Sequence, residues 1–418
     1  MGPRGAARTH KPVTAVHILR LAAGGDGVGK LPDGKTVFVP RTAPGDVVTL
    51  TGLREHKRFA RARLDLLIET SRERVEPRCP HYTNDECGGC QLQHLNYEAQ
   101  LQSRRSFVGD ALRRLGKQEI PDPAIVPAIG TYDYRTKLTL HVSEDGRRIG
   151  LHRYGRPNEV FDLEWCHITI PDLMELWQVV RTLRPFLPAR LLQVVLRLDR
   201  SGGRHVVVRV GEGEVWSGFD RLRGELERSG TPATIWYQPE GGAARAVAGA
   251  GEAFPATVFE QVNPEMGDRV RTFALEQLGN VSGHLVWDLY AGIGESTAQL
   301  IAMGARVESV EVDRRAVAEA EARGPAARRI TGRVEDVLGE LHQPGLVIVN
   351  PPRTGMDHRV CTGLNRVAPR RMVYISCDPA TLARDLQRLE RFRLSLVQAF
   401  DLFPQTTHVE TVAILETV

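Results

Sequence analysis

The sequence predicts an α/β fold in its C-terminal part, preceded by a small β-barrel and an α+β domain. From about residue 257 onward, helical and strand-like segments alternate, which is typical of a parallel sheet. Residues 13–70 carry short apolar runs broken by turn signals, which is typical of a small antiparallel barrel. The length of 418 residues exceeds that of one ordinary domain and indicates two or three.

The composition limits the class of protein. With 42% hydrophobic and 25% charged residues, the chain is globular and has enough apolar residues for a sizeable core. It has no apolar run of about eighteen residues, the length that would suggest a membrane span. Its first residues, MGPRGAARTHKP, have no apolar centre. We therefore expect no membrane span, no secretory signal and a cytoplasmic location.

Positive charge is concentrated near the N-terminus. Residues 1–70 contain twelve Lys and Arg against six Asp and Glu, so this segment carries +6, while the whole chain carries +4 and the remainder −2. Such an asymmetry indicates a module that binds a polyanion. The densest part, REHKRFARAR at residues 54–63, also fits a solvated strand or helix face. Both interpretations stay open on this evidence.

The patterns divide the chain into four segments. These are a disordered tail (1–12), the β-barrel (13–70), a central α+β domain (71–255) and the α/β domain (256–418). The glycine-rich GGDGVG at residues 24–29 precedes a hairpin-like PDGK rather than a helix, so we do not interpret it as a dinucleotide-binding turn. In the central segment a cysteine-bearing loop leads into a predicted helix over 96–116, and a second helix is predicted near 171–185.

The α/β domain begins with a predicted helix over residues 264–277. The predicted strands that follow are LVWDLY (285–290), RVESVEVD (306–313), RRITGRV (328–334), LVIVN (346–350), RMVYIS (371–376), RLSLVQAF (393–400) and VETVAIL (409–415). The last two form a hairpin around DLFPQTTH, so the final strand should run antiparallel to its neighbours. It therefore begins at the edge where the parallel strands end, which is where open α/β sheets bind ligands.

The turn after the first strand predicts a nucleoside site. Its pattern is D-x-x-x-G-x-G, with Asp288, Gly292 and Gly294, and it lacks the third glycine of a dinucleotide fingerprint. An acid at the end of the second strand would hydrogen-bond ribose hydroxyls; Glu311, 23 residues after Asp288, has about the expected spacing, and Asp313 competes with it. Without pyrophosphate machinery, S-adenosylmethionine (SAM) fits this turn better than a dinucleotide. A purely structural turn is the alternative.

A rigid segment follows the fourth strand, which ends in Asn350-Pro-Pro-Arg353. Consecutive prolines fix an extended exit from the strand and hold the preceding side chain in place. The functional interpretation is a polar group, Asn350, aimed at the transferred methyl group or at the acceptor base. A structural Pro-Pro loop is the alternative.

Cys377 lies where a buried strand gives way to a loop, and Glu410 begins the final antiparallel strand. The fold should therefore bring this thiol and this carboxylate to one edge of the sheet. The pair suits methylation of a pyrimidine at C5: a thiolate adds to C6, C5 attacks an activated methyl group, and a base removes the C5 proton. The alternatives are a buried thiol, common for free cysteine, and a surface glutamate.

Six segments in order resemble the motifs of the RNA 5-methyluridine (uracil-C5) methyltransferase family. They are FEQVNP (259–264), DLYAGIGEST, SVEVD, NPPRTGMD, YISCDPATLARDL and FPQTTHVETV. The resemblance implies a Rossmann-like, SAM-dependent methyltransferase domain in which Cys377 is the nucleophile and Glu410 the proton-abstracting base. The residues that it implies for the cofactor and base site, together with those of the glycine turn, are Gln261, Asp288, Tyr290, Gly292, Gly294, Glu311 and Asn350.

The sequence departs from the family pattern at two places. The usual motif is Asp-Pro-Pro-Arg, and here its first residue is Asn350. A neutral amide can accept from uracil N3–H and donate to O4, whereas an ionised carboxylate only accepts, so we expect activity to survive this change. The helix after Glu311 also lacks the asparagines usual in the family, which puts the contacts to adenine in doubt.

The N-terminal half resembles the ribosomal RNA branch of the family. GVGKLPDGKTVFVPRTAPGDVV resembles its TRAM (OB-like) β-barrel, and YRTK followed by GLHRYGRPNEVFDLEWC resembles its central domain. Lys and Arg on such a barrel would bind phosphates without reading sequence. The expected partner is RNA, in a loop or single strand, because the target base must be extruded.

Four of the six cysteines form a predicted metal site. They are Cys79, Cys87, Cys90 and Cys166, and they contain a CxxC core. Four thiolates bind either zinc or an iron–sulfur cluster, and spacing alone does not decide between them. The resemblance implies a [4Fe–4S] cluster of structural or RNA-orienting role, although seven residues separate Cys79 from Cys87, slightly more than usual. Cys361 is expected in the core.

Three alternatives remain within the sequence evidence. The substrate could be transfer RNA, since ribosomal RNA is favoured by analogy only. An amino-group N-methyltransferase would use Asn350-Pro-Pro and would have no need of Cys377 or Glu410. A non-enzymatic RNA-binding or ribosome-assembly factor would not need the intact glycine turn. We expect a monomer.

Overall fold

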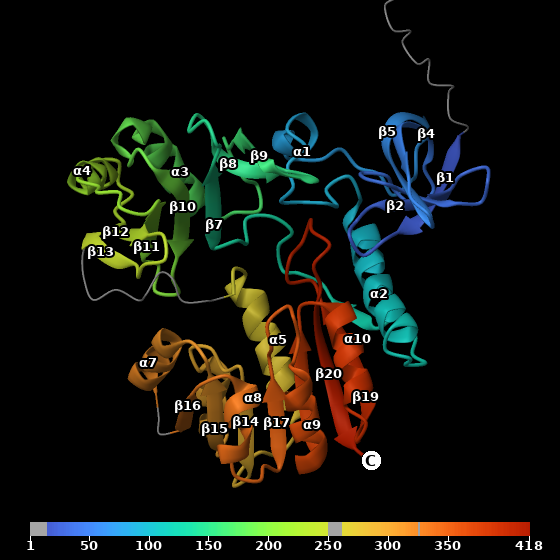
Figure 1. The fold of residues 1–418 in the computed structure, drawn as a ribbon, viewed down its shortest axis with the longest axis vertical. Helices are drawn as coiled ribbons and strands as arrows, with labels where there is room; N and C mark the ends of the chain where they lie inside the picture. The colour runs from blue at the N-terminus through green and yellow to red at the C-terminus, as the bar shows by residue number, and fades with distance from the viewer. Residues whose placement is uncertain (1–14, 250–260, 325–326) are drawn as a thin grey trace, which may run out of the picture.

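The computed structural model describes residues 15–249, 261–324 and 327–418 (Figure 1). The predicted tail at 1–12 and the predicted boundary at residues 255 and 256 lie outside the described residues, as do the first residues of the 259–264 motif. Three sheets make up the described chain, and Figure 1 shows the N-terminal barrel and the central sheet side by side above the C-terminal sheet. No helix in the described ranges is long and apolar enough to cross a membrane.

The N-terminal sheet is a closed barrel with strand order β1-β2-β3-β5-β4. Its strands are β1 (Val16–Leu21), β2 (Gly27–Lys30), β3 (Thr36–Val39), β4 (Val47–Glu55) and β5 (Phe59–Glu69). Apolar side chains that alternate along these strands fill the interior, among them Val16, Ile18 and Val48. The prediction of a barrel is confirmed, but one pair departs from it, because β3 and β5 run parallel.

The central sheet has seven strands in the order β13-β12-β11-β10-β7-β8-β9. They are β7 (Lys137–Val142), β8 (Ile149–Arg153), β9 (Arg156–Asp162), β10 (Leu191–Leu198), β11 (Arg204–Val210), β12 (Thr234–Pro239) and β13 (Arg245–Ala248). Two helices, α3 (Pro171–Thr182) and α4 (Phe219–Arg228), bury their apolar sides on the sheet, with Trp177 at the centre of the contact. A short helix, α1 (Pro80–Asn84), lies in the cysteine-bearing loop, and a 3₁₀ turn covers Arg184–Phe186.

The C-terminal sheet has eight strands in the order β16-β15-β14-β17-β18-β20-β19-β6. Seven come from the predicted α/β domain: β14 (Leu285–Leu289), β15 (Arg306–Glu311), β16 (Arg328–Thr331), β17 (Leu346–Val349), β18 (Arg371–Ser376), β19 (Phe392–Phe400) and β20 (Glu410–Thr417). Its helices are α5 (Pro264–Gln277), α6 (Glu295–Ala302), α7 (Arg314–Arg323), α8 (Val334–Val337), α9 (His358–Val367) and α10 (Pro379–Arg388), with a 3₁₀ turn at Leu338–Glu340. The five strands from β16 to β18 are parallel, and β20 is antiparallel to β18, as predicted.

Two elements of the predicted central segment pack on the C-terminal sheet instead. Helix α2 (Tyr97–Arg114) places Val108 and Leu112 in the same apolar core as α10, and β6 (Ala124–Val126) pairs with β19. The helix was predicted over 96–116, but a helical pattern does not identify the sheet on which the helix packs. A single central segment over 71–255 therefore does not describe how this part of the chain packs.

The loop between β19 and β20 is hydrogen-bonded to helix α2, to the segment before the central sheet and to the cysteine-bearing loop. Arg104 of α2 is fully buried; its Nε and Nη2 donate to the carbonyl of Thr406 at 3.1 and 2.8 Å, and Nε lies 3.5 Å from Asp401. Tyr134, just before the central sheet, donates to the carbonyl of Pro404 at 2.9 Å. The amide N–H groups of two residues in the cysteine-bearing loop donate to the carbonyl of Gln405. This loop is thus fixed from several sides immediately before Glu410.

We predict that Arg104→Met lowers the free energy of unfolding by about 3–5 kcal/mol, because it leaves a buried carboxylate and a buried carbonyl without their cationic donor. Urea unfolding followed by circular dichroism measures this change. The control is Arg114→Met on the same helix, where the side chain is 64% exposed and a change within about 0.5 kcal/mol is expected. Equal stability of the two variants would contradict a supporting role for Arg104.

Candidate active site

A cavity of about 1170 Å³ opens at the carboxyl edge of the parallel strands. Eight of the nine predicted catalytic and cofactor residues line it: Gln261, Asp288, Tyr290, Gly292, Glu311, Asn350, Cys377 and Glu410. The ninth, Gly294, is not part of the lining. It caps α6 with φ of +77°, and a Cβ there would lie 2.9 Å from the Cβ of Ala320, so this glycine permits close packing of α7 against the turn.

The glycine turn and Glu311 form one hydrogen-bonded unit. Tyr290 and Gly292 both have positive φ, 63° and 56°, which turns the backbone away from β14. Glu311 accepts from the amide of Gly292 at 2.9 Å and from the amide of Asp313 at 2.8 Å. Asp313 instead accepts from the amide of Arg315 and caps α7. Of the two acids considered from the sequence, Glu311 is therefore the one bound to the turn.

Asp288 stabilises the turn through a buried hydrogen bond. It is 3% exposed and accepts from the hydroxyl of Thr297 at 2.6 Å, which ties the end of β14 to α6. Burial raises the pKa of Asp288 to about 6, and the hydroxyl of Thr297 and the charge of Arg271 partly oppose this rise. Arg271 also lines the cavity, a position that the sequence analysis did not anticipate.

Cys377 and Glu410 come together because of strand register. Ser376 of β18 pairs with Thr411 of β20, so the antiparallel ladder brings the next residue, Cys377, opposite Glu410. Glu410 is 2% exposed, and its Oε2 has no hydrogen-bond partner among the described residues. Burial raises its pKa to about 8, against an opposing effect of Arg353. The carboxyl is thus mainly protonated at neutral pH in this structure.

The thiol of Cys377 is also shifted toward its neutral form. Burial raises its pKa first, and the negative charge of Glu410 raises it further, while the guanidinium of Arg353 lowers it. Arg353 lies in the Asn-Pro-Pro-Arg segment and reaches the imidazole of His408, with Nη2 and Nε2 3.5 Å apart. Burial and Arg353 lower the pKa of His408 to about 4, so its ring is neutral. Both residues stood in quoted motifs, but no role was predicted for either.

Asn350 occupies the position predicted for it. It follows β17, and its backbone N–H donates to the carbonyl of Leu289 at 3.2 Å. Its side chain is exposed at the cavity. Backbone pairing and the two prolines after it fix this residue beside the end of β14. The exposed amide is thus free to meet a ligand in the cavity.

The four predicted metal-binding cysteines line a second cavity of about 560 Å³. They come from three places in the cysteine-bearing loop and from the segment before α3. Burial raises the pKa of Cys87 to about 12 and raises the pKa values of Cys79 and Cys90, so without a cation these groups are thiols. Within residues 15–249, 261–324 and 327–418, no three His, Cys, Asp or Glu side chains are grouped as ligands of one metal ion.

Comparisons with known proteins identify the family of this chain. A family model described as tRNA (uracil-5-)-methyltransferase matches residues 324–418, and a TRAM domain model matches residues 8–64. An RNA methyltransferase of Halalkalibacterium halodurans is 30% identical, and the alignment covers 97% of each chain. The chain belongs to the RNA (uracil-5-)-methyltransferase family. It is an RNA methyltransferase, and its N-terminal barrel is a TRAM domain.

Two further relatives of this methyltransferase have named substrates. The 23S rRNA (uracil(1939)-C(5))-methyltransferase RlmD of Dichelobacter nodosus is 29% identical, with 96% of this chain and 98% of RlmD aligned. The crystal structure of Pyrococcus abyssi tRNA (uracil-54, C5)-methyltransferase with S-adenosyl-L-homocysteine has a TM-score of 0.74 and 23% identity, and covers 96% of this chain and 99% of that one. The second likeness confirms the fold of the methyltransferase.

The raised pKa of Glu410 predicts a pH-dependent stability. The folded pKa, about 8, lies above the ordinary 4.5, so the contribution of the protonated carboxyl is fully present below pH 4.5 and is lost as pH rises through about 8. Glu410→Gln keeps a neutral side chain at every pH. We therefore expect the free energy of unfolding of the variant to rise relative to that of the wild type from roughly pH 5 to pH 9, the range spanned by the pKa shift. Urea unfolding at each pH measures this difference.

The control for this experiment is Glu390→Gln, which removes an exposed glutamate from the segment before β19. Its stability should follow that of the wild type across the same pH range. Curves for Glu410→Gln and the wild type that stay parallel would show that Glu410 ionises normally in the folded protein.

Proposed function

We propose that the protein methylates C5 of a uridine in 23S ribosomal RNA through a covalent bond between Cys377 and C6 of the base. The observation that carries this proposal is the placement of Cys377 opposite Glu410 in the lining of the cavity of about 1170 Å³. A thiol and a carboxyl in this relation have a use in C5 methylation and none in methylation of an amino group. The alternative of an N-methyltransferase using Asn350 is therefore less well supported.

The proposed chemistry assigns one step to each group. Cys377 releases its proton to solvent, a change that the positive charge of Arg353 favours, and the thiolate would form a bond to C6 of uracil as the C5–C6 double bond breaks. The electron pair placed on C5 would then take the methyl group that SAM supplies. Glu410, after losing its own proton to solvent, would remove the remaining proton from C5, and the C6–S bond would break to restore the double bond and the thiolate. The products are 5-methyluridine and S-adenosylhomocysteine.

The remaining residues of the cavity would bind and orient. Glu311 is fixed by two amide donors and has the position expected of a ribose-binding acid. Tyr290 and Gly292 would present the turn to the rest of the cofactor, and Gln261 lines the same cavity. Asn350 would pair with the edge of the uracil, accepting from N3–H and donating to O4.

The preference for ribosomal RNA rests on two features. The full-length similarity to RlmD includes both the TRAM barrel and the region of the four cysteines. Transfer RNA is the second candidate, because the solved structure with the same fold acts on transfer RNA. We infer that the enzyme acts as a cytoplasmic monomer.

The proposal predicts distinct outcomes for two variants. Purified protein is incubated with methyl-labelled SAM and unmodified ribosomal or transfer RNA, and the labelled nucleoside is identified by mass spectrometry. We expect 5-methyluridine from ribosomal RNA, and its loss in Cys377→Ala. Glu410→Gln should methylate C5 but not release the base, so that labelled RNA migrates with the protein in a denaturing gel.

Cys361→Ala is the matched control, because Cys361 is buried in the apolar core and does not line the cavity. This variant should still form 5-methyluridine. Label in an N-methylated nucleoside, or activity retained in Cys377→Ala, would contradict the thiolate mechanism. Label from transfer RNA alone would contradict the proposed substrate.

We further propose that the four-cysteine cavity holds a [4Fe–4S] cluster. The support for this proposal is that the four thiols line one cavity, and that four thiolates are the ligand set of this cluster type. Such a cluster would cross-link the cysteine-bearing loop to the segment that carries Cys166. The proposed methyl transfer moves no electron, so this role is structural.

Protein purified without oxygen should contain about four iron and four sulfide per chain, the composition of this cluster type. Cys90→Ser should lose both, and Cys361→Ser should keep both. Iron and sulfide are measured by chemical analysis, zinc by mass spectrometry, and unfolding by circular dichroism. One zinc per chain, or iron unaffected by Cys90→Ser, would contradict the proposal.

A further inference from the structure

The tip of the β4–β5 hairpin carries an exposed pair of aromatic rings. His56 and Phe59 are stacked, with ring centroids 4.5 Å apart and planes inclined by 25°. The amide of His56 donates to the carbonyl of Phe59 at 2.8 Å, so the tight hairpin itself holds both rings on one side. Phe38 of β3 supports Phe59 edge-on at 5.7 Å. His56 is exposed, so the outer face of this stack is open to solvent.

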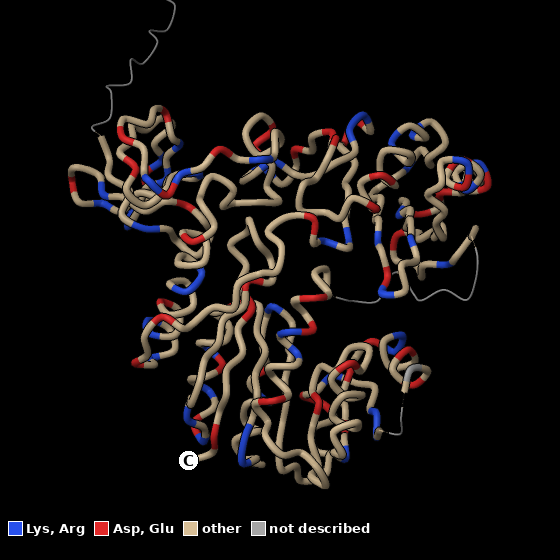
Figure 2. Tube along the Cα trace, turned by 180° about the vertical axis from the view of Figure 1, so that it is seen from behind, with Lys and Arg blue, Asp and Glu red and all other residues tan. Residues whose placement is uncertain are grey.

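Cations surround these rings without acidic partners. Lys57 and Arg58 form the tip of the hairpin between the two rings, and both are exposed. Arg54 and Arg63 are exposed on the adjoining strands, and in the described part of the chain no acidic group forms an ion pair with any of these four residues. Figure 2 shows Lys and Arg recurring along the barrel strands. The acid nearest in sequence, Glu55, is paired with Lys35 of the turn between β2 and β3.

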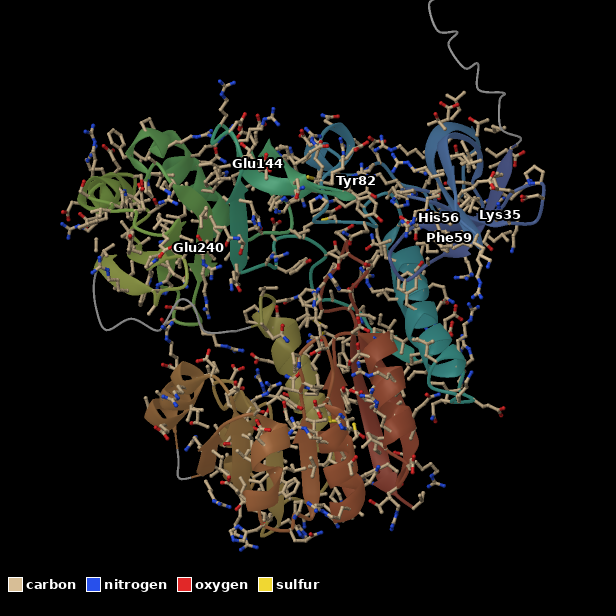
Figure 3. All side chains as sticks on the ribbon, viewed as in Figure 1. Lys35, His56, Phe59, Tyr82, Glu144 and Glu240 are labelled. Atoms are coloured by element: carbon tan, nitrogen blue, oxygen red, sulfur yellow. The ribbon has the colours of Figure 1, made fainter. Side chains whose placement is uncertain are left out.

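Figure 3 shows where His56 and Phe59 lie. His56 and Phe59 are next to each other on the lower side of the barrel, which in that view is the side nearer the methyltransferase sheet. A strand of RNA that reached the active-site cavity could therefore also pass this hairpin. The hairpin tip has no part in the cavity, whose lining comes from the C-terminal half and the segments beside it.

We propose that His56 and Phe59 form a stacking platform for an unpaired base of the RNA substrate, with Lys57 and Arg58 binding the phosphates on either side. The chemistry follows from the two components. An exposed aromatic stack favours the flat face of any base, and unpaired cations favour the backbone. A duplex buries its base faces, so the platform selects single-stranded RNA. This inference rests on the proposed action on RNA.

The test uses the full-length protein and a fluorescently labelled single-stranded oligoadenylate, which contains no uracil to enter the active site. Binding is measured by anisotropy over a range of salt concentrations. His56→Ala and Phe59→Leu should each weaken binding about tenfold at every salt concentration, the effect of losing one base stack. Lys57→Ala and Arg58→Ala should each reduce the salt slope by about 0.7, the effect of one phosphate contact.

The chain offers a matched control for the histidine. His17 is exposed on the same barrel, but it pairs with Val47 at the start of β4, the opposite end of that strand from His56. His17→Ala should bind as the wild type. Because Phe59 is half-buried, circular dichroism must show that Phe59→Leu is folded; if it is not, the variant at the exposed His56 gives an independent result.

Three results would overturn the proposal. These are unchanged binding by both His56→Ala and Phe59→Leu, equal binding of a matched RNA duplex, and equal competition by polyglutamate, which has charge but no bases. The methyl-transfer assay separates this inference from the proposed function. If the wild type forms 5-methyluridine but the platform variants bind oligoadenylate normally, only the platform is wrong. If the wild type methylates no RNA, the proposed function fails, whereas platform-dependent binding of oligoadenylate would still stand.

Discussion

The buried guanidinium of Arg104 is the interaction on which the arrangement of the active site depends. It binds the carbonyl of Thr406, 302 residues away in the sequence, at a position with no access to water. A buried cation is costly unless its donors are used, so its carbonyl partners have little freedom to move. Thr406 lies four residues before Glu410, and the carbonyl of Phe403, which also lines the cavity, is a further acceptor at 3.4 Å. Helix α2 thereby fixes the loop that leads into the strand carrying the proposed base.

The same loop couples the four-cysteine cavity to the active site. The carbonyl of Gln405 accepts from the amides of Gln91 and Leu92, the two residues that follow Cys90. Arg135 lines both cavities, and Tyr134 beside it is hydrogen-bonded to Pro404. A group that ordered the cysteines would therefore also order the loop before Glu410. This connection gives a proposed cluster a physical role in the reaction although no electron is transferred.

Much of the C-terminal fold could be predicted because its signals are local. Apolar runs, glycines and prolines placed the strands, and the antiparallel final strand predicted that Cys377 and Glu410 would meet. The packing of α2 could not be predicted in this way, because an apolar helix face does not specify which sheet it covers. Arg104 reads in the sequence as one more cation on a basic helix, and only its burial distinguishes it. Arg353 and His408 likewise acquire their meaning from a contact between two loops.

The charges of the cavity are mixed, so it offers a polyanion little net attraction. Seven acidic residues line it, among them Glu311, Asp313 and Glu335, against five arginines. The carboxylates suit a cationic sulfonium cofactor, and the arginines offset part of their repulsion of a polyanion. Burial raises the pKa of Glu410 to about 8, which reduces the negative charge at the point where the proposed uridine would enter. The +6 segment at residues 1–70 then supplies the attraction that the cavity lacks. In this arrangement, the proposed binding of RNA and the proposed chemistry place opposite demands on charge, and the chain meets them on different sheets.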